Sequence, residues 1–359
     1  MRTTVMRRAL LAAAAGWAIV PRLAKSTETI AIGGAGSNFI GPVMQRWGEL
    51  LPEASGVSVT FKSVGTGVAQ SAVMAGEIDF AAVELPLPAK TLADGDLMQV
   101  PVAFGALVCV VNIPGIASNQ ILLTAQLLGD IYGGAIKTWD DPKIAAANPG
   151  AKLPNLAIRP IRLDTPAGSV FSTTYTFTRY LLSANQDWRD KYGTEVPRRW
   201  AVGSVTDSAE SMVATIKLLP GSIGYMALGT ATAAGMTTVM LRNKAGHAVA
   251  ASLDSLRATV DRVDWGNAPD IVPRLVDLEG EGTWPLVLAT YIVLPRNPKD
   301  PARGDAVRRF VNFVVVHGAD GAAQRGAVAL TPVPPQAQAS AKRRTVRTAV
   351  LGMLGQAAD

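Results

Sequence analysis

Two hydrophobic periods alternate along the chain from about residue 27 onward. Short apolar runs typical of strands occur in ETIAIGG, VSVTFKSV and EIDFAAVELPL, and segments with helical spacing separate them. The first helical segment, SNFIGPVMQRWGELL, places these apolar residues on one face: Phe39, Ile40, Val43, Met44, Trp47, Leu50 and Leu51. This order predicts a βαβαβ unit, in which right-handed crossovers produce an open parallel sheet with helices on both sides.

The pattern changes after the apolar run around Cys109. From NIPGIASNQ onward, proline and glycine separate short helical pieces, which indicates a second domain. This domain continues through the strand IRLD, a helix over 171–182 and the stretch LLPGSIGYMAL. Near Trp284 the chain becomes apolar and strand-like again, and AVRRFVNFVVVHG follows as an amphipathic helix. We expect this last strand and helix to return to the first sheet, so that two crossings join two lobes.

The composition fits two packed domains, since 48% of the 359 residues are hydrophobic. The first residues differ from this average. The basic MRTTVMRR, the apolar ALLAAAAGWAIV and the break PRLAKS form the three-part pattern of a signal peptide, assigned to residues 1–25. No cysteine follows its apolar part, so we expect export by the Sec or Tat route to the periplasm without a lipid anchor. Removing its five basic residues lowers the formal charge from +6 to +1, and we expect no nucleic-acid partner.

Few residues have the chemistry of a catalyst or a metal ligand. Cys109 is the single cysteine and lies in an apolar run, where we expect it to pack in the core. His247 and His317 have no cluster of acidic residues or cysteines around them. The chain has no G-x-S-x-G, P-loop or H-E-x-x-H motif and no complete G-x-G-x-x-G. We expect a binding protein without metal or cofactor, not an enzyme; an extracytoplasmic hydrolase or interaction protein is the alternative from another class.

Three loops at the carboxyl ends of the predicted strands are rich in small residues: GGAGSNF, SVGTGV and AAVELP. Ligands of open α/β sheets bind at this edge, and a helix N-terminus there offers backbone N–H groups to an anion. The same residues also serve as ordinary helix N-caps. Arg162 and Asp164 lie two residues apart just before a helix. Such a pair is either a solvated turn or an anion site in which the aspartate holds a bidentate arginine.

Glu84 interrupts the apolar run FAAVELPL at the end of the third strand. A carboxylate in such a place costs free energy unless a partner stabilises it. One interpretation is an exposed strand end. The other is a carboxylate that accepts a hydrogen bond from a protonated ligand oxygen and repels an oxyanion that has no proton to offer.

These blocks resemble the PstS-type periplasmic phosphate-binding proteins of ABC importers over nearly the whole mature chain. GAGSNFIGPVMQRW is similar to the opening loop and helix of that family, and IDFAAVELPL to its third strand. VNIPG and LGDIYGGAIKTWDDPKIAAANPG resemble its most specific central block, and LPGSIGY and the strand near Trp284 complete the order. The resemblance implies a type II periplasmic-binding-protein fold, in which two α/β lobes are joined by a double hinge with the ligand cleft between them.

The resemblance also implies a ligand site. Its residues would be Ser37, Asn38 and Phe39 in the first loop, Thr66 in the second, Glu84 in the third, and the pair Arg162 and Asp164. Beyond that pair the chain carries about five residues more than the family pattern, so either Gly168 and Ser169 or Ser172 and Thr173 form the anion-binding element. Glu84 is one methylene longer than the family's aspartate, and SVTDSAESM replaces a glycine-rich loop.

We therefore expect a receptor that captures inorganic phosphate and delivers it to a membrane-embedded ABC permease. The alternative is a diverged paralogue that binds another oxyanion, an organophosphate or phosphonate, or an uncharged solute. Lobe I is expected over 26–107 and 288–345, lobe II over 108–287 and a tail over 346–359, and the protein is expected to be a monomer.

Overall fold

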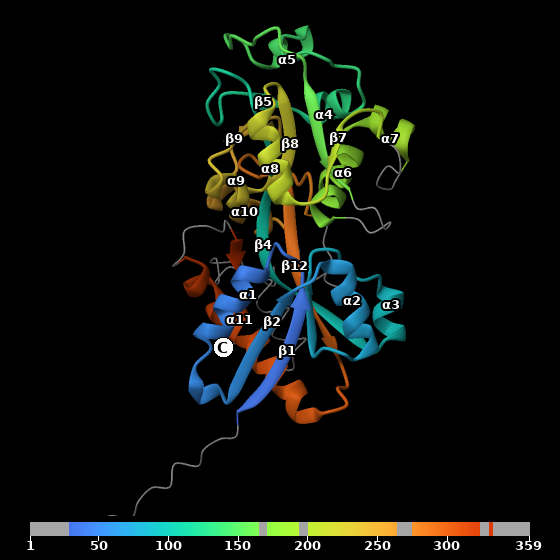
Figure 1. Ribbon diagram of the computed structural model, residues 1–359, viewed down its shortest axis with the longest axis vertical. Coiled ribbons are helices and arrows are strands. Elements are labelled where there is room, and N and C mark those ends of the chain that lie inside the picture. The colour runs from blue at the N-terminus through green and yellow to red at the C-terminus, as the bar shows by residue number, and fades with distance from the viewer. Residues whose placement is uncertain (1–28, 165–170, 194–199, 264–274, 324–329, 333–359) are drawn as a thin grey trace, which may run out of the picture.

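The computed structural model describes residues 29–164, 171–193, 200–263, 275–323 and 330–332. Figure 1 shows two bodies of structure, one above the other, and two long strands that run from one into the other. We call the lower body lobe I and the upper body lobe II. The linking strands are β4 (Leu97–Val111) and β12 (Val287–Pro295). The expected signal peptide and C-terminal tail lie outside the described residues.

Lobe I is a sheet covered by helices on both faces (Figure 1). Its other elements are β1 (Ile30–Gly36), α1 (Gly41–Leu50), a short 3₁₀ helix (Glu53–Ser55), β2 (Val57–Ser63), α2 (Thr66–Ala75), β3 (Phe80–Val83), α3 (Ala89–Asp94), α11 (Pro301–Ala323) and β13 (Leu330–Pro332). The predicted βαβαβ unit is confirmed, because β1 pairs in parallel with both β2 and β3. In α1 the predicted face is buried at Val43, Met44 and Trp47, while Leu50 is half-buried.

Lobe II contains the second half of the sheet and a small separate sheet. Its elements are β5 (Leu122–Leu123), α4 (Ala125–Tyr132), α5 (Pro142–Ala147), β6 (Arg159–Leu163), α6 (Ser172–Ala184), α7 (Gln186–Tyr192), β7 (Ser204–Thr206), α8 (Ala209–Leu218), β8 (Ser222–Ala227), α9 (Leu228–Ala233), β9 (Thr237–Thr238), β10 (Met240–Arg242), β11 (Ala248–Val249) and α10 (Leu253–Val260). The larger sheet has the order β2-β1-β3-β12-β4-β8-β6-β7, with β9 and β13 also paired to β4, and the smaller one the order β11-β10-β5.

The two linking strands correct the expectation of an all-parallel sheet. β12 lies antiparallel to both β3 and β4, because it returns from lobe II in the direction opposite to the first three strands. β4 pairs with β12 up to Ala106 and with β8 from Leu107 onward. All fifteen residues of β4 are buried, as expected of a strand covered on both faces. Cys109 is among them, which confirms its predicted packing role.

Each lobe has an aromatic cluster in its core. In lobe I the centroid of the Phe80 ring lies 6.2 Å from that of Phe61 and 5.5 Å from that of Phe310. Because Phe310 belongs to α11 and Phe80 to β3, α11 packs on the sheet of lobe I. In lobe II the rings of Phe177 and Tyr225 stack at 4.4 Å. None of the helices in the described ranges has both the length and the apolar character that a membrane crossing needs.

Candidate anion-binding site

The three predicted loops of lobe I meet at one edge of the sheet. The register pairs Gly36 at the end of β1 with Ser63 of β2 and with Ala82 of β3. The N–H of Ser37 donates to the carbonyl of Ala82 at 3.0 Å, which joins the first loop to the third. Gly36 has no room for a side chain, since a Cβ there would lie 2.1 Å from that same carbonyl oxygen. The close approach of β1 and β3 thus brings Ser37 next to Glu84.

Glu84 is the buried acid of this edge, with 4% of its surface exposed. The Ser172 hydroxyl donates to its Oε2 and the Thr290 hydroxyl to its Oε1, both at 3.2 Å, and the Ser37 side chain also hydrogen bonds to it. Burial raises the pKa of Glu84 from its ordinary 4.5 to about 7, and the three hydroxyls oppose that rise. The interpretation of Glu84 as an exposed strand end is therefore wrong.

Arg162 and Asp164 lie at the end of β6 in lobe II. Asp164 Oδ2 accepts from Arg162 Nη1 at 2.6 Å, and the guanidinium lies over the Trp200 ring with its Cζ 5.7 Å from the ring centroid. The Arg162 side chain is only 15% exposed, and within the described part of the chain its Nε is a buried donor without a hydrogen-bond partner. A buried guanidinium N–H without a partner is costly and suits a ligand oxygen.

The start of α6 brings lobe II to Glu84. The Thr174 hydroxyl donates to the carbonyl of Leu163 at 3.0 Å, which holds this turn beside Arg162. Ser172 reaches across to Glu84, and the Thr173 hydroxyl is buried with no hydrogen-bond partner among the described residues. Gly168 and Ser169, the other candidates for the anion-binding element, lie outside the described residues.

Backbone donors at this place are free of side-chain caps. The N-caps of α1, α2 and α6 are Ile40, Gly65 and Phe171, and none makes a side-chain capping bond. Six other helices (α4, α5, α7, α8, α10 and α11) carry a capping side chain, whereas α3 and α9 do not. Uncapped N–H groups and the helix dipole favour a bound anion.

The remaining predicted residues lie in the first two loops of lobe I. Asn38 is exposed, whereas Phe39 is half-buried and its N–H donates to the Ser37 hydroxyl at 3.0 Å. Thr66 is the half-buried first residue of α2. Two contacting residues are absent from the prediction: Thr290, which hydrogen bonds to Glu84, and Trp200, whose ring lies against Arg162. The sequence could have indicated Thr290, because it is a polar residue inside the apolar run VLATYIVLP.

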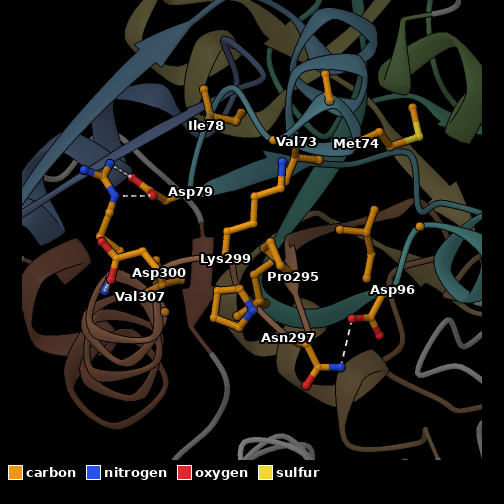
Figure 2. A pocket seen from close by; sticks show the side chains of 18 residues that line it. Val73, Met74, Ile78, Asp79, Asp96, Pro295, Asn297, Lys299, Asp300 and Val307 are labelled. Carbon is orange, nitrogen blue, oxygen red and sulfur yellow. Dashed lines mark hydrogen bonds and ion pairs between the residues drawn. The ribbon is translucent and has the colours of Figure 1, made fainter.

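A hollow of about 350 Å³ lies elsewhere in lobe I. Figure 2 shows its lining, which comes from the C-terminal end of α2, the start of β4, the end of β12 and the start of α11. Arg303 pairs there with Asp79, and Asn297 donates to Asp96 at 2.9 Å. Thr66 begins α2 at its opposite end, so this hollow is separate from the predicted anion site.

The fold and the site together define a two-lobed α/β solute-binding protein with donors of both lobes around one buried carboxylate. The chain matches the model of the PBP superfamily domain over residues 23–316. It is 32% identical over 315 residues to "Phosphate-binding protein PstS" of Xylella fastidiosa strain Temecula1, covering 88% of this chain and 85% of that protein. The chain belongs to the PstS family of substrate-binding receptors.

Solved structures show the same fold at lower identity. One is a periplasmic phosphate-binding protein, PfluDING, solved with bound phosphate; it has a TM-score of 0.64 and 18% identity and covers 85% of this chain and 91% of its own. Another is a phosphate binding protein from Stenotrophomonas maltophilia, with a TM-score of 0.63, 17% identity, and coverage of 90% of this chain and 93% of its own. These likenesses confirm the predicted α/β periplasmic-binding fold.

Proposed function

We propose that this protein captures inorganic phosphate between its lobes and delivers it to an ABC permease. The observation that carries the proposal is the bond from Ser172 to the buried Glu84 carboxylate, made by a turn that lies beside two buried donors without partners, Arg162 Nε and Thr173 Oγ1. One acceptor among many donors suits an oxyanion that carries both negative charge and a proton. Membership of the PstS family and the names of the relatives support the same ligand.

Recognition divides between the two lobes. Arg162, held by Asp164, would donate to ligand oxygens together with Thr173 and the N–H groups at the start of α6. Lobe I would add the first-turn N–H groups of α2, with Ser37, Asn38, Phe39 and Thr66 around them. Gly168 and Ser169 stay candidates for the same anion loop. A ligand that binds both lobes favours the closed state by its differential affinity for that state.

Glu84 would provide selectivity. Ionised, it accepts the proton of a hydrogen phosphate but repels sulfate, which has no proton at neutral pH. In the described conformation the Ser172 hydroxyl donates to Oε2 of Glu84. A ligand that donates its proton to Oε2 would therefore displace this hydroxyl of lobe II. Capture would therefore exchange an interlobe hydrogen bond for ligand bonds to both lobes.

The proposal extends to the setting of the protein. It acts as a monomeric receptor without chemistry on its ligand, in the periplasm, after export by Sec or Tat and without a lipid anchor. Its partner is a membrane-embedded ABC permease. Two histidines in the chain and a site of hydroxyls and one ion pair support a receptor rather than a catalyst.

The test is isothermal titration of inorganic phosphate into mature protein that has been unfolded and refolded to remove carried ligand. We expect saturable one-to-one heat that sulfate does not reproduce. In Glu84→Gln the preference for phosphate over sulfate should fall by at least about tenfold, because the amide can donate to an unprotonated oxygen. No heat from phosphate with protein shown to be native by circular dichroism would contradict the proposal.

A second candidate ligand is a phosphonate or phosphate ester. It is favoured by the roughly five residues by which the loop after Arg162 and Asp164, within 165–173, exceeds the family pattern. Methylphosphonate and a phosphate monoester, titrated in parallel, separate the two candidates. Tighter binding of either than of inorganic phosphate would select this second candidate.

A further inference from the structure

Thr290 is a polar residue in the apolar strand β12, and its hydroxyl is not needed for apolar packing there. It lies in the run VLATYIVLP, whose residues are buried up to the last position, and is itself 1% exposed. A buried hydroxyl needs a hydrogen-bond partner. Thr290 Oγ1 donates to Glu84 Oε1 at 3.2 Å, although the two residues are 206 positions apart in the chain.

An irregularity in the sheet lies at this residue. β12 pairs Thr290 with Ala103 of β4 but Tyr291 with Pro101, so the register shifts between Thr290 and Tyr291. Proline has no N–H to donate, which explains why the ladder breaks opposite Pro101. On its other side Tyr291 pairs with Val83, the residue before Glu84. Such bulges re-aim side chains next to functional sites.

The two oxygens of Glu84 therefore have different kinds of partner. Oε1 is held by Thr290, which belongs to the same continuous sheet as β3. Oε2 accepts from Ser172 of lobe II, a bond that would break if the lobes separated, and the Ser37 hydroxyl of lobe I also hydrogen bonds to the carboxylate. Of these three hydroxyls only that of Ser172 belongs to lobe II, so its bond is the one that lobe separation would release for a ligand.

We propose that Thr290 is a positioning residue, which fixes Oε1 of Glu84 so that Oε2 stays an acceptor aimed at the ligand proton. This inference rests on the proposed function for the identity of that ligand. Thr290 does not contact the ligand in this scheme. It acts through Glu84 by orienting the carboxylate and by keeping it ionised although it is buried.

The surroundings of Glu84 support the second part of this role. Its neighbours within the described residues are the hydroxyls of Ser37, Ser172 and Thr290, and each lowers a pKa that burial raises. No charged side chain is among the causes of that shift. The Tyr291 phenol, buried next to Thr290, has a raised pKa and stays neutral. In lobe II, Arg162 and Asp164 at the end of β6 pair with each other.

The experiment measures phosphate binding by calorimetry in Thr290→Val, which keeps the shape and removes the hydroxyl, and in Thr290→Ser, which restores it. Near pH 7 we expect affinity to fall about tenfold in Thr290→Val and to stay within about twofold in Thr290→Ser. Near pH 9, where Glu84 is ionised in either protein, the Thr290→Val loss should shrink. In a Glu84→Gln background, Thr290→Val should change affinity by less than about twofold.

One control variant separates positioning from packing. Thr178→Val removes another fully buried threonine hydroxyl, which donates only to helix carbonyls of Thr174 and Tyr175, and should leave the pH profile of binding unchanged. An equal loss in the wild-type and Glu84→Gln backgrounds, with no pH dependence, would overturn the proposal.

A second readout needs no ligand. The carboxyl carbon of Glu84, followed by NMR in isotope-labelled protein, should titrate at a higher pH in Thr290→Val than in wild type, because one donor to the carboxylate is lost. An unchanged midpoint overturns the positioning role even if phosphate binding weakens. A raised midpoint in a protein that binds no phosphate supports the role of Thr290 and contradicts the proposed function alone.

Discussion

At the scale of single residues, the ionisation of Glu84 couples ligand recognition to stability. Burial raises its pKa to about 7 in the folded protein, while the unfolded chain has the ordinary value of 4.5. Between these pH values the folded protein keeps a proton that the unfolded chain has lost, so the free energy of unfolding falls as pH rises through this window. The folded protein above pH 7 therefore holds a buried charge that the ligand proton would stabilise.

Glu84→Gln tests this coupling, because the amide has the same shape and no charge. Below about pH 4.5 the two proteins differ little, and above pH 7 the variant should be more stable by up to roughly 3 kcal/mol. Urea unfolding near pH 5 and pH 8 without ligand checks this. Glu53→Gln, at an exposed glutamate of the 3₁₀ helix, serves as the matched control. An equal stability difference at both pH values would contradict the assigned pKa.

Residue-scale prediction from sequence succeeds where a polar residue breaks an apolar run. Glu84 in FAAVELPL is such a residue: its sequence left open an exposed strand end or a partnered carboxylate, and the structure shows it buried with partners. Thr290 in VLATYIVLP has the same signal in weaker form, since threonine is common in strands. Trp200 has none, because its contact with Arg162 depends on the pairing of β7 with β6, which local patterns do not encode. Whether the predicted set binds a ligand stays a prediction.

At the scale of elements, the start of α6 combines two adjacent threonines with opposite expected roles. The Thr173 hydroxyl is buried without a partner in the described structure, whereas the Thr174 hydroxyl donates to the Leu163 carbonyl and lies 2.8 Å from the Tyr225 hydroxyl. A buried donor without a partner costs stability, and a satisfied one contributes to it. We therefore expect the first hydroxyl to bind the ligand and the second to stabilise the fold.

Thr173→Val and Thr174→Val test this assignment as a matched pair. Thr173→Val should leave the free energy of unfolding unchanged or raise it by up to about 1 kcal/mol, and should weaken phosphate binding about tenfold. Thr174→Val should lower the free energy of unfolding by about 1 to 3 kcal/mol. Urea unfolding and calorimetry measure both. A Thr173→Val protein that is less stable and binds phosphate normally would reverse the assignment.

Two things limit the prediction of helices and strands from the sequence: the number of residues in the element, and its pairing with strands that are distant in the chain. The strands and the two helices of the βαβαβ unit are predictable because their periods extend over enough residues. β5, β9, β10 and β11 have two or three residues each, too few to show a period. The antiparallel direction of β12 depends on a return from lobe II, which local patterns do not encode.

At the scale of the whole molecule, β4 and β12 are the two expected crossings. β4 changes its partner from β12 to β8 between Ala106 and Leu107. The predicted limits of the lobes at 107/108 and 287/288 remain a proposal, which we base on this change of partner. Sequence patterns locate crossings but not the angle between lobes, since that angle depends on a few contacts between distant residues.

The Ser172–Glu84 hydrogen bond is such a contact, because it joins α6 of lobe II to the end of β3 in lobe I. Ser172→Ala removes it, and the loss of about 1 kcal/mol should shift the ligand-free population towards open forms about fivefold. Small-angle X-ray scattering should then show a larger radius of gyration than in wild type without ligand. Saturating phosphate should bring both proteins to the same value, since ligand bonds replace the lost bridge. An unchanged ligand-free radius would mean that other contacts hold the lobes together and that this hydrogen bond does not determine closure.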